Sequence, residues 1–299
     1  MDTVEFGSRS WDPSSRILLA DGAWGTEFMK LGLVQGESPE AWNLDRGEAV
    51  LAVARSYAAA GSDIILTNSF GGSRLQLARH GMAEKAGEIN LRAARLSAQA
   101  AREASTGERQ VIVAGDLGPC GKLFIMGEVE EGELYDSFAE QALALKAGGA
   151  DWLVIETMID RTEMEVAVCA AAATGLPVVA SMTYEKMPGG YRTVMGDRPE
   201  DCIAAAEDAG AALIGANCGS GIDAYVELAR TLRSLTKKPV WIKANAGLPE
   251  IIDGRTVYRM AAEAWCSHIP ALLEAGVNVI GGCCGTGPDF IARARKFVP

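Results

Sequence analysis

Continuous apolar segments recur along the chain, and each follows an alanine-rich stretch that ends in glycine. The pattern is plain at Gly61, Gly149, Gly210 and Gly276, where a short turn leads from the glycine into the apolar segment. Glycine after the last helical turn is a common helix C-cap, and an apolar run without alternation is typical of a parallel strand that is buried on both faces. The repetition of helix, glycine and strand therefore predicts βα units.

Eight segments fit the strand pattern: residues 16–22, 63–70, 110–115, 151–158, 177–183, 211–218, 239–244 and 277–283. Helical patterns cover residues 48–60, 83–104, 133–148, 161–174, 199–210, 222–235 and 258–275, and a short last helix runs from Pro288 towards Phe297. Eight βα units in this length predict a (β/α)₈ TIM barrel, with a doubly wound parallel sheet as the alternative. We expect a single barrel domain over residues 16–299, preceded by an N-terminal extension over residues 1–15.

Composition narrows the class of protein. The net charge of −11 argues against a nucleic-acid partner, because phosphate binding needs clustered lysine and arginine. No apolar run approaches the roughly 20 residues that a membrane span needs, and the polar start of the chain lacks the core of a signal peptide. Seven cysteines without a secretion signal indicate a reducing compartment, in which thiols bind metal or pack. We therefore expect a cytoplasmic globular protein.

The predicted strands end on polar side chains that are mostly followed by glycine. These strand-end residues are Asp21, Asn68, Asp116, Glu156, Glu185, Asn217, Asn245 and Cys283. Barrel enzymes carry their chemistry at the C-terminal ends of the strands, in the βα loops. The sequence therefore predicts that these side chains meet at one rim of the barrel.

Three cysteines at this rim suggest a metal site. Cys283 and Cys284 lie among four glycines at the end of the last predicted strand, and Cys218 ends another strand in a similar context. Thiolates bind zinc strongly, and glycine lets the chain bend so that neighbouring sulfurs face one point. A buried cysteine is more often a small apolar residue, but glycine-flanked vicinal cysteines gain little from packing. A three-thiolate zinc site leaves one position for a soft ligand, above all a substrate thiolate.

Other residues of the rim fit an amino-acid thiol. Asp21 and Glu156 could bind an ammonium group, and the backbone amides of residues 22–26 could receive a carboxylate. Helix capping is the alternative for Asp21. Asn68, Asn217 and Asn245 could orient the site or bind substrate, with backbone capping as the alternative.

Three further features stay open. A methyl donor with a quaternary ammonium group would need an aromatic cage, for which Trp24, Trp42, Phe70, Tyr184 and Tyr191 are candidates, with ordinary loop packing as the alternative. The polar loop over residues 185–192 could be a lid or a docking surface for a methyl-carrying corrinoid protein. Cys120 follows a strand end and has no assigned role.

The sequence resembles the homocysteine S-methyltransferase family, which includes betaine-dependent enzymes and the homocysteine-binding module of cobalamin-dependent methionine synthase. The segments that carry the resemblance are Asp21-Gly22-Ala23-Trp24-Gly25-Thr26, residues 66–72, Ile155-Glu156-Thr157-Met158, Gly215-Ala216-Asn217-Cys218-Gly219 and residues 280–286. The resemblance implies a (β/α)₈ barrel with zinc on Cys218, Cys283 and Cys284. It also implies that homocysteine binds through Asp21, the amides of Gly22, Ala23 and Thr26, and Glu156, with Asn68 and Asn217 beside it.

The function that the residues and the resemblance favour is zinc-dependent methyl transfer to homocysteine, which forms methionine. The expected donor is a betaine-type molecule or a separate methyl-corrinoid protein. The alternatives are another thiol acceptor, a sulfonium donor such as S-methylmethionine, or a non-catalytic thiol- or zinc-binding module of a methyl-transfer assembly. Self-association into a homo-oligomer is left open.

Overall fold

The computed structural model describes residues 1–34, 36–107, 109–252 and 255–298, and its centre is one eight-stranded parallel sheet. In sheet order the strands are β3 (Leu18–Leu19), β14 (Val279–Gly282), β11 (Val240–Asn245), β10 (Leu213–Gly221), β7 (Val178–Met182), β6 (Trp152–Met158), β5 (Ile112–Leu117) and β4 (Ile64–Leu66). A parallel bridge between Ala20 and Ile64 joins the two end strands. The sheet therefore closes into the predicted (β/α)₈ barrel.

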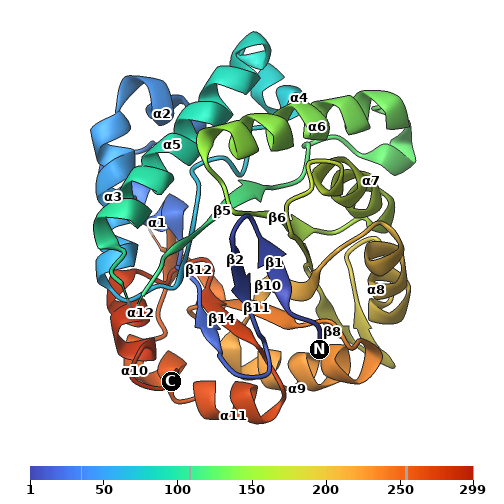
Figure 1. Cartoon of the computed structure of the whole chain (residues 1–299). Coiled ribbons are helices and arrows are strands. Elements are labelled where there is room, and N and C mark those ends of the chain that lie inside the picture. The colour runs from blue at the N-terminus through green and yellow to red at the C-terminus, as the bar shows by residue number, and fades with distance from the viewer. Residues whose placement is uncertain (35, 108, 253–254, 299) are drawn as a thin grey trace.

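Helices surround the barrel, as Figure 1 shows in a view along its axis. The main ones are α3 (Gly47–Ala59), α5 (Ala86–Ala104), α6 (Glu131–Gly148), α7 (Arg161–Ala172), α8 (Pro199–Asp208), α9 (Ile222–Leu235) and α12 (Pro288–Ala294). Shorter helices α1 (Trp24–Lys30), α2 (Trp42–Asp45) and α4 (Arg74–Ala78) follow the first two barrel strands. No helix in the described ranges is long and apolar enough to cross a membrane.

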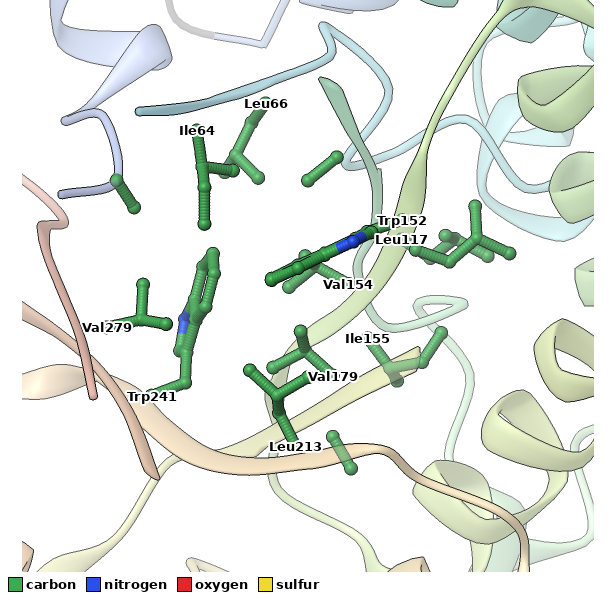
Figure 2. Close-up of a cluster of buried hydrophobic side chains, with 14 of the residues drawn as sticks. Ile64, Leu66, Leu117, Trp152, Val154, Ile155, Val179, Leu213, Trp241 and Val279 are labelled. Carbon is green, nitrogen blue, oxygen red and sulfur yellow. The ribbon is translucent and has the colours of Figure 1, made fainter. Parts of the chain in front are cut away.

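Large side chains fill the barrel below its C-terminal rim. Trp152 and Trp241 are fully buried, and Figure 2 shows their rings inside the barrel among Ile64, Val154 and Val179. Successive residues of a strand face opposite sides, so one set of alternate positions points into the barrel and the other points at the helices. This packed layer supports the polar residues that follow on the same strands towards the rim.

A hairpin covers the amino end of the barrel, within the segment expected only as an N-terminal extension. It consists of β1 (Val4–Phe6) and β2 (Arg9–Trp11), and it lies over the centre of the barrel in Figure 1. The rings of Phe6 and Trp11 each lie 5.6 Å from the ring of Trp152, and Arg9 pairs with Asp151. The hairpin thus closes the end of the barrel opposite the rim that carries the strand-end polar residues.

The helix expected over residues 258–275 is wrong. A β-hairpin of β12 (Pro249–Ile252) and β13 (Arg255–Tyr258) comes first, followed by two short helices, α10 (Ala262–Cys266) and α11 (Ile269–Glu274). Pro270 lies in the first turn of α11, where its missing amide is tolerated, but it cannot continue a helix that began at Tyr258. A second rim hairpin, β8 (Glu185–Met187) with β9 (Gly190–Arg192), occupies the polar loop after β7.

Candidate functional site

Three cysteine side chains converge at the C-terminal rim of the barrel. Cys218 lies in β10, and Cys283 and Cys284 follow directly after β14. Their three Sγ atoms lie within 4.8 Å of one another, and each side chain is half-buried. This spacing lets one ion contact all three sulfurs. The donor set fits a soft or borderline cation such as zinc, because thiolates are its preferred ligands.

The backbone at Cys218 is adapted to this convergence. Cys218 has a φ of 61°, which few residues other than glycine adopt, and Gly219 follows with a φ of 66°. The hydroxyl of Tyr225 donates a hydrogen bond of 2.6 Å to the Cys218 carbonyl and so fixes the turn. Backbone conformations of this kind cost energy and cluster at functional sites.

The Cys283–Cys284 turn is held just as closely. The amide of Cys283 donates to the carbonyl of Ala244 at 2.9 Å, and the Thr286 hydroxyl donates to the Cys283 carbonyl at 2.6 Å. A Cβ atom on Gly282 would lie 2.1 Å from Oγ1 of Thr286, so only glycine fits there. The strand thus ends in a closely packed turn that has both sulfurs near Cys218.

The thiols share negative charge. Hydrogen bonds from the Cys283 and Cys284 thiols lower the pKa of Cys218 to about 3, and the same contacts raise the pKa of Cys283 well above its ordinary value. A bound divalent cation favours deprotonation of every thiol that it contacts.

Asn217 braces the cysteines from inside the barrel. Its Oδ1 accepts hydrogen bonds from the Thr157 amide at 2.8 Å and the Ser181 hydroxyl at 2.7 Å. Its Nδ2 donates to the Thr157 hydroxyl at 2.7 Å and contacts Cys283 Sγ at 3.9 Å. Thr157 also has a φ of 61°. The side-chain amide of Asn217 therefore holds a second strand end whose backbone is strained. The side chain of Asn217 is therefore engaged by protein groups on both of its ends.

A buried ion pair lies beside the cluster, and Lys243, one of its members, was missing from the sequence-based site. Lys243 lies in β11 and its side chain is only 2% exposed. Its Nζ is 3.0 Å from Oδ1 of Asp21 and 3.9 Å from Oε2 of Glu156. Burial alone would lower the pKa of Lys243, but the carboxylates of Asp21 and Glu156 outweigh it and raise that pKa. Lys243 is thus a fixed internal cation.

Asp21 is fully engaged by protein donors. Besides the contact with Lys243, its Oδ2 accepts hydrogen bonds from Nε1 of Trp24 and from the amide of Leu66, both at 2.7 Å. Asp21 therefore ties the first, second and seventh strands of the barrel together at the rim.

Two other carboxyl groups at the rim are buried without such partners. Glu156 lies near the end of β6 and Asp116 lies in β5, and each residue is 6% exposed. Glu156 Oε2 and Asp116 Oδ1 have no hydrogen-bond partner among the described residues. Burial raises the pKa of both groups, and for Asp116 the charge of Glu156 raises it further. These two carboxyl groups are therefore open polar positions of the rim.

The loop after β3 touches the cysteine turn. A Cβ on Gly22 would lie 2.4 Å from the Thr286 carbonyl, and the Ala23 amide donates to that carbonyl at 2.9 Å. The Thr26 hydroxyl accepts from the Gly285 amide at 3.2 Å. Helix geometry leaves the first amides of α1 without acceptors inside the helix, so they are available as donors.

The remaining asparagines of the rim have different surroundings. Nδ2 of Asn68 donates to the Pro39 carbonyl at 2.7 Å and to Oδ1 of Asn43 at 3.0 Å, so this side chain fastens the loop after β4 to a neighbouring turn. Asn245 ends β11, and its side chain hydrogen-bonds to the Cys218 sulfur. Of these two residues, only Asn245 contacts the cysteine cluster.

Most of the candidate aromatic cage is packed into the protein. Trp24, Trp42, Tyr184 and Tyr191 are at most 9% exposed. Phe70 is 39% exposed, and its ring lies against Gly118, where a Cβ would meet it at 2.5 Å. Four of the five aromatic candidates therefore follow the ordinary packing alternative.

Two more residues complete the rim. Cys120 is buried away from the cluster, and its amide donates to the Glu163 carboxylate at 2.6 Å. Tyr258 ends β13 and hydrogen-bonds to Cys284. The sequence pattern does not place Tyr258 at the site, because it predicts a helix for this segment.

Comparisons with known proteins find related sequences and a related fold. A family model described as homocysteine S-methyltransferase matches residues 18–298. Methionine synthase from Mycobacterium leprae is 29% identical over 298 residues, and methionine synthase from Mycobacterium tuberculosis is 28% identical over the same length. Each match covers 95% of this chain but 24% and 25% of the respective relative, so the chain spans about a quarter of their length.

A solved structure shares the fold. The metallated form of the homocysteine methyltransferase MmuM from Escherichia coli superposes with a TM-score of 0.79 at 22% identity. The match covers 96% of this chain and all of that one. The barrel architecture is therefore the same over nearly the whole length of both chains.

Proposed function

Because the chain belongs to the homocysteine S-methyltransferase family, we propose that it transfers a methyl group to the thiol of homocysteine and so forms methionine. The observation that carries the proposal is the convergence of three cysteine sulfurs within 4.8 Å beside buried carboxyl groups at the barrel rim. The cysteine sulfurs could hold a metal that activates the thiol of a substrate, and the carboxyl groups could bind an ammonium group of the same substrate. Homocysteine carries both of these groups, which is why we propose it as the methyl acceptor.

Cys218, Cys283 and Cys284 would hold a zinc ion. A zinc ion on three protein ligands would leave a fourth position for the substrate thiol, and it would lower the pKa of that thiol so that it binds as a nucleophilic thiolate. Asn217 and Tyr225 hold the ligand turns, Asn217 through its side chain and Tyr225 through the Cys218 carbonyl. Fixed ligands of this kind orient the nucleophile and contribute proximity.

The amino-acid part of the substrate would lie over the neighbouring strand ends. Glu156 is positioned to accept hydrogen bonds from the ammonium group, because its Oε2 is without a protein donor among the described residues. The first amides of α1, after Gly22 and Ala23, would receive the carboxylate. Asp21, Thr26 and Asn68 hold this surface in place through the contacts described above. The sulfur then attacks the donor methyl group, and the bond from methyl to donor breaks with its electron pair remaining on the donor.

The rim favours a macromolecular donor over betaine. A quaternary ammonium group needs an aromatic cage, and of the five candidates only Phe70 is exposed. Exposed apolar side chains instead lie on several rim loops: Leu123, Met126, Met187, Val194 and Leu248. A methyl-corrinoid protein that docks on these loops fits this surface, and betaine or a sulfonium such as S-methylmethionine are the small-molecule alternatives. The thiol cluster must stay reduced to bind metal, which supports a cytoplasmic location.

A direct assay tests the proposal. The zinc-loaded protein is incubated with homocysteine and one methyl source at a time: a methylated corrinoid, glycine betaine or S-methylmethionine. We expect methionine with the corrinoid and none after the metal is removed by a chelator. Absence of methionine with all three donors would contradict the proposed activity and favour a non-catalytic thiol-binding module. A methylated product from another thiol, but not from homocysteine, would change the acceptor.

A further inference from the structure

The acidic part of the rim holds more carboxyl groups than basic groups among the described residues. Three buried carboxyl groups, Asp21, Asp116 and Glu156, lie near one another, and Lys243 is the basic group that the structure places among them. Lys243 is within hydrogen-bond distance of Asp21 at 3.0 Å, whereas its 3.9 Å distance from Glu156 is too long for a hydrogen bond. Buried polar atoms in proteins are normally hydrogen-bonded, so Oδ1 of Asp116 and Oε2 of Glu156 remain as acceptors for a donor from a ligand.

Asp116 and Glu156 face the same space. Asp116 is opposite Val154 in the parallel pairing of β5 with β6, so it shares the inward face with Val154 and with Glu156 two residues further on. Figure 2 shows Val154 inside the barrel. The unpartnered oxygens are thus on neighbouring strands, at successive levels of the barrel interior, and both residues are 94% buried.

The position of Asp116 is fixed by its backbone. Its amide donates to the Thr67 hydroxyl at 2.9 Å, and its carbonyl accepts from the Ser69 hydroxyl at 2.7 Å and from Nε2 of Gln141 at 3.3 Å. None of these bonds uses the unpartnered side-chain oxygen. A buried carboxyl oxygen that no protein group satisfies needs another partner, which a donor group of a ligand can supply.

We propose that Asp116 is a substrate-specificity residue, which together with Glu156 binds the ammonium group of the amino-acid thiol, while Lys243 keeps Asp21 out of that role. This inference rests on the proposed function and adds to it. It assigns the site to thiols that carry a cationic amino group, and it predicts discrimination against thiol acids of the same length that lack one. Glu156 alone would not complete the pocket, because a primary ammonium has three donors to satisfy.

Binding measurements separate the amino group from the thiol. Titration calorimetry of the zinc-loaded protein compares homocysteine with 4-mercaptobutanoate, which keeps the thiol and carboxylate but has no amino group. We expect Asp116→Asn to weaken homocysteine binding by about 10-fold or more, as for the loss of a hydrogen bond to a charged group, and to change the Kd for 4-mercaptobutanoate by less than about twofold. Asp136→Asn, on the exposed face of α6, is the matched control and should change neither value.

The outcomes separate this inference from the proposed function. Equal weakening of both thiols by Asp116→Asn, or no change in either, would overturn the role of Asp116. Failure of the unmodified protein to bind homocysteine would instead overturn the proposed function. Zinc content and the melting temperature are measured for every variant. If Asp116→Asn does not fold, Asp116→Ser is titrated in its place and is judged by the same comparison of the two thiols.

Discussion

Cys283→Ser is expected to lose both zinc and methionine formation. Cys283 lies within 4.8 Å of both other sulfurs and also contacts Asn217, so its replacement removes a metal ligand and the brace on that ligand. A serine hydroxyl is a poor ligand at neutral pH because it keeps its proton. Loss of metal activation removes several kcal/mol of transition-state stabilisation, which corresponds to a rate decrease on the order of a thousandfold or more.

The measurement is zinc content by elemental analysis together with the rate of methionine formation. Cys169→Ser is the matched control, because Cys169 is an exposed cysteine on α7 outside the cluster. It should retain one zinc per chain and the full rate. Cys218→Ser and Cys284→Ser should behave as Cys283→Ser does. A Cys283→Ser protein that turns over at the normal rate without zinc would refute the metal site.

Lys243→Met is expected to destabilise the fold by about 3–5 kcal/mol, because it leaves the Asp21 carboxylate buried without its cation. Methionine has nearly the same length as lysine, so the packing against Gly281 is retained. A Cβ on that glycine would lie 2.9 Å from Cγ of Lys243, which shows how closely the side chain crosses the strand. The change in the free energy of unfolding is measured by urea denaturation.

Two further variants isolate the buried charge. Lys186→Met removes the same group from an exposed pair with Glu227, whose side chains are 60% and 59% exposed, and should cost no more than about 1 kcal/mol. The double variant Asp21→Asn/Lys243→Met should recover part of the loss, since it removes the unpaired charge as well. A loss of unfolding free energy below about 1 kcal/mol for Lys243→Met would show that the buried pair contributes no more to stability than an exposed one.

The barrel was predictable because its signals are local and repeated. Each strand is a continuous apolar run after a helix that ends in glycine, and the structure places a parallel strand within or overlapping each of the eight predicted segments. The cysteine cluster was predictable for a related reason. Parallel strands in a barrel end at one rim, so Cys218 and the pair after β14 had to lie on the same face.

The features that the sequence did not predict share a physical cause, because contacts between distant parts of the chain determine their structure. Lys243 stands inside an apolar strand, and the sequence alone does not tell which buried acid would pair with it. The N-terminal hairpin alternates buried and exposed residues over Val4, Glu5 and Phe6, a strand signal too short to outweigh its polar surroundings. Tyr258 lies in a rim hairpin because its strand pairs with β12, a contact that the helical pattern of the segment does not reveal.

The sulfur coordination of bound zinc tests the central claim most directly. X-ray absorption at the zinc edge is recorded for the zinc-loaded protein before and after addition of homocysteine, with methionine as the control ligand. The three cysteines predict three sulfur ligands in the free protein, a fourth with homocysteine, and no added sulfur with methionine, whose thioether is a weak ligand. A count that stays at three with saturating homocysteine would contradict activation of the substrate thiol at this site.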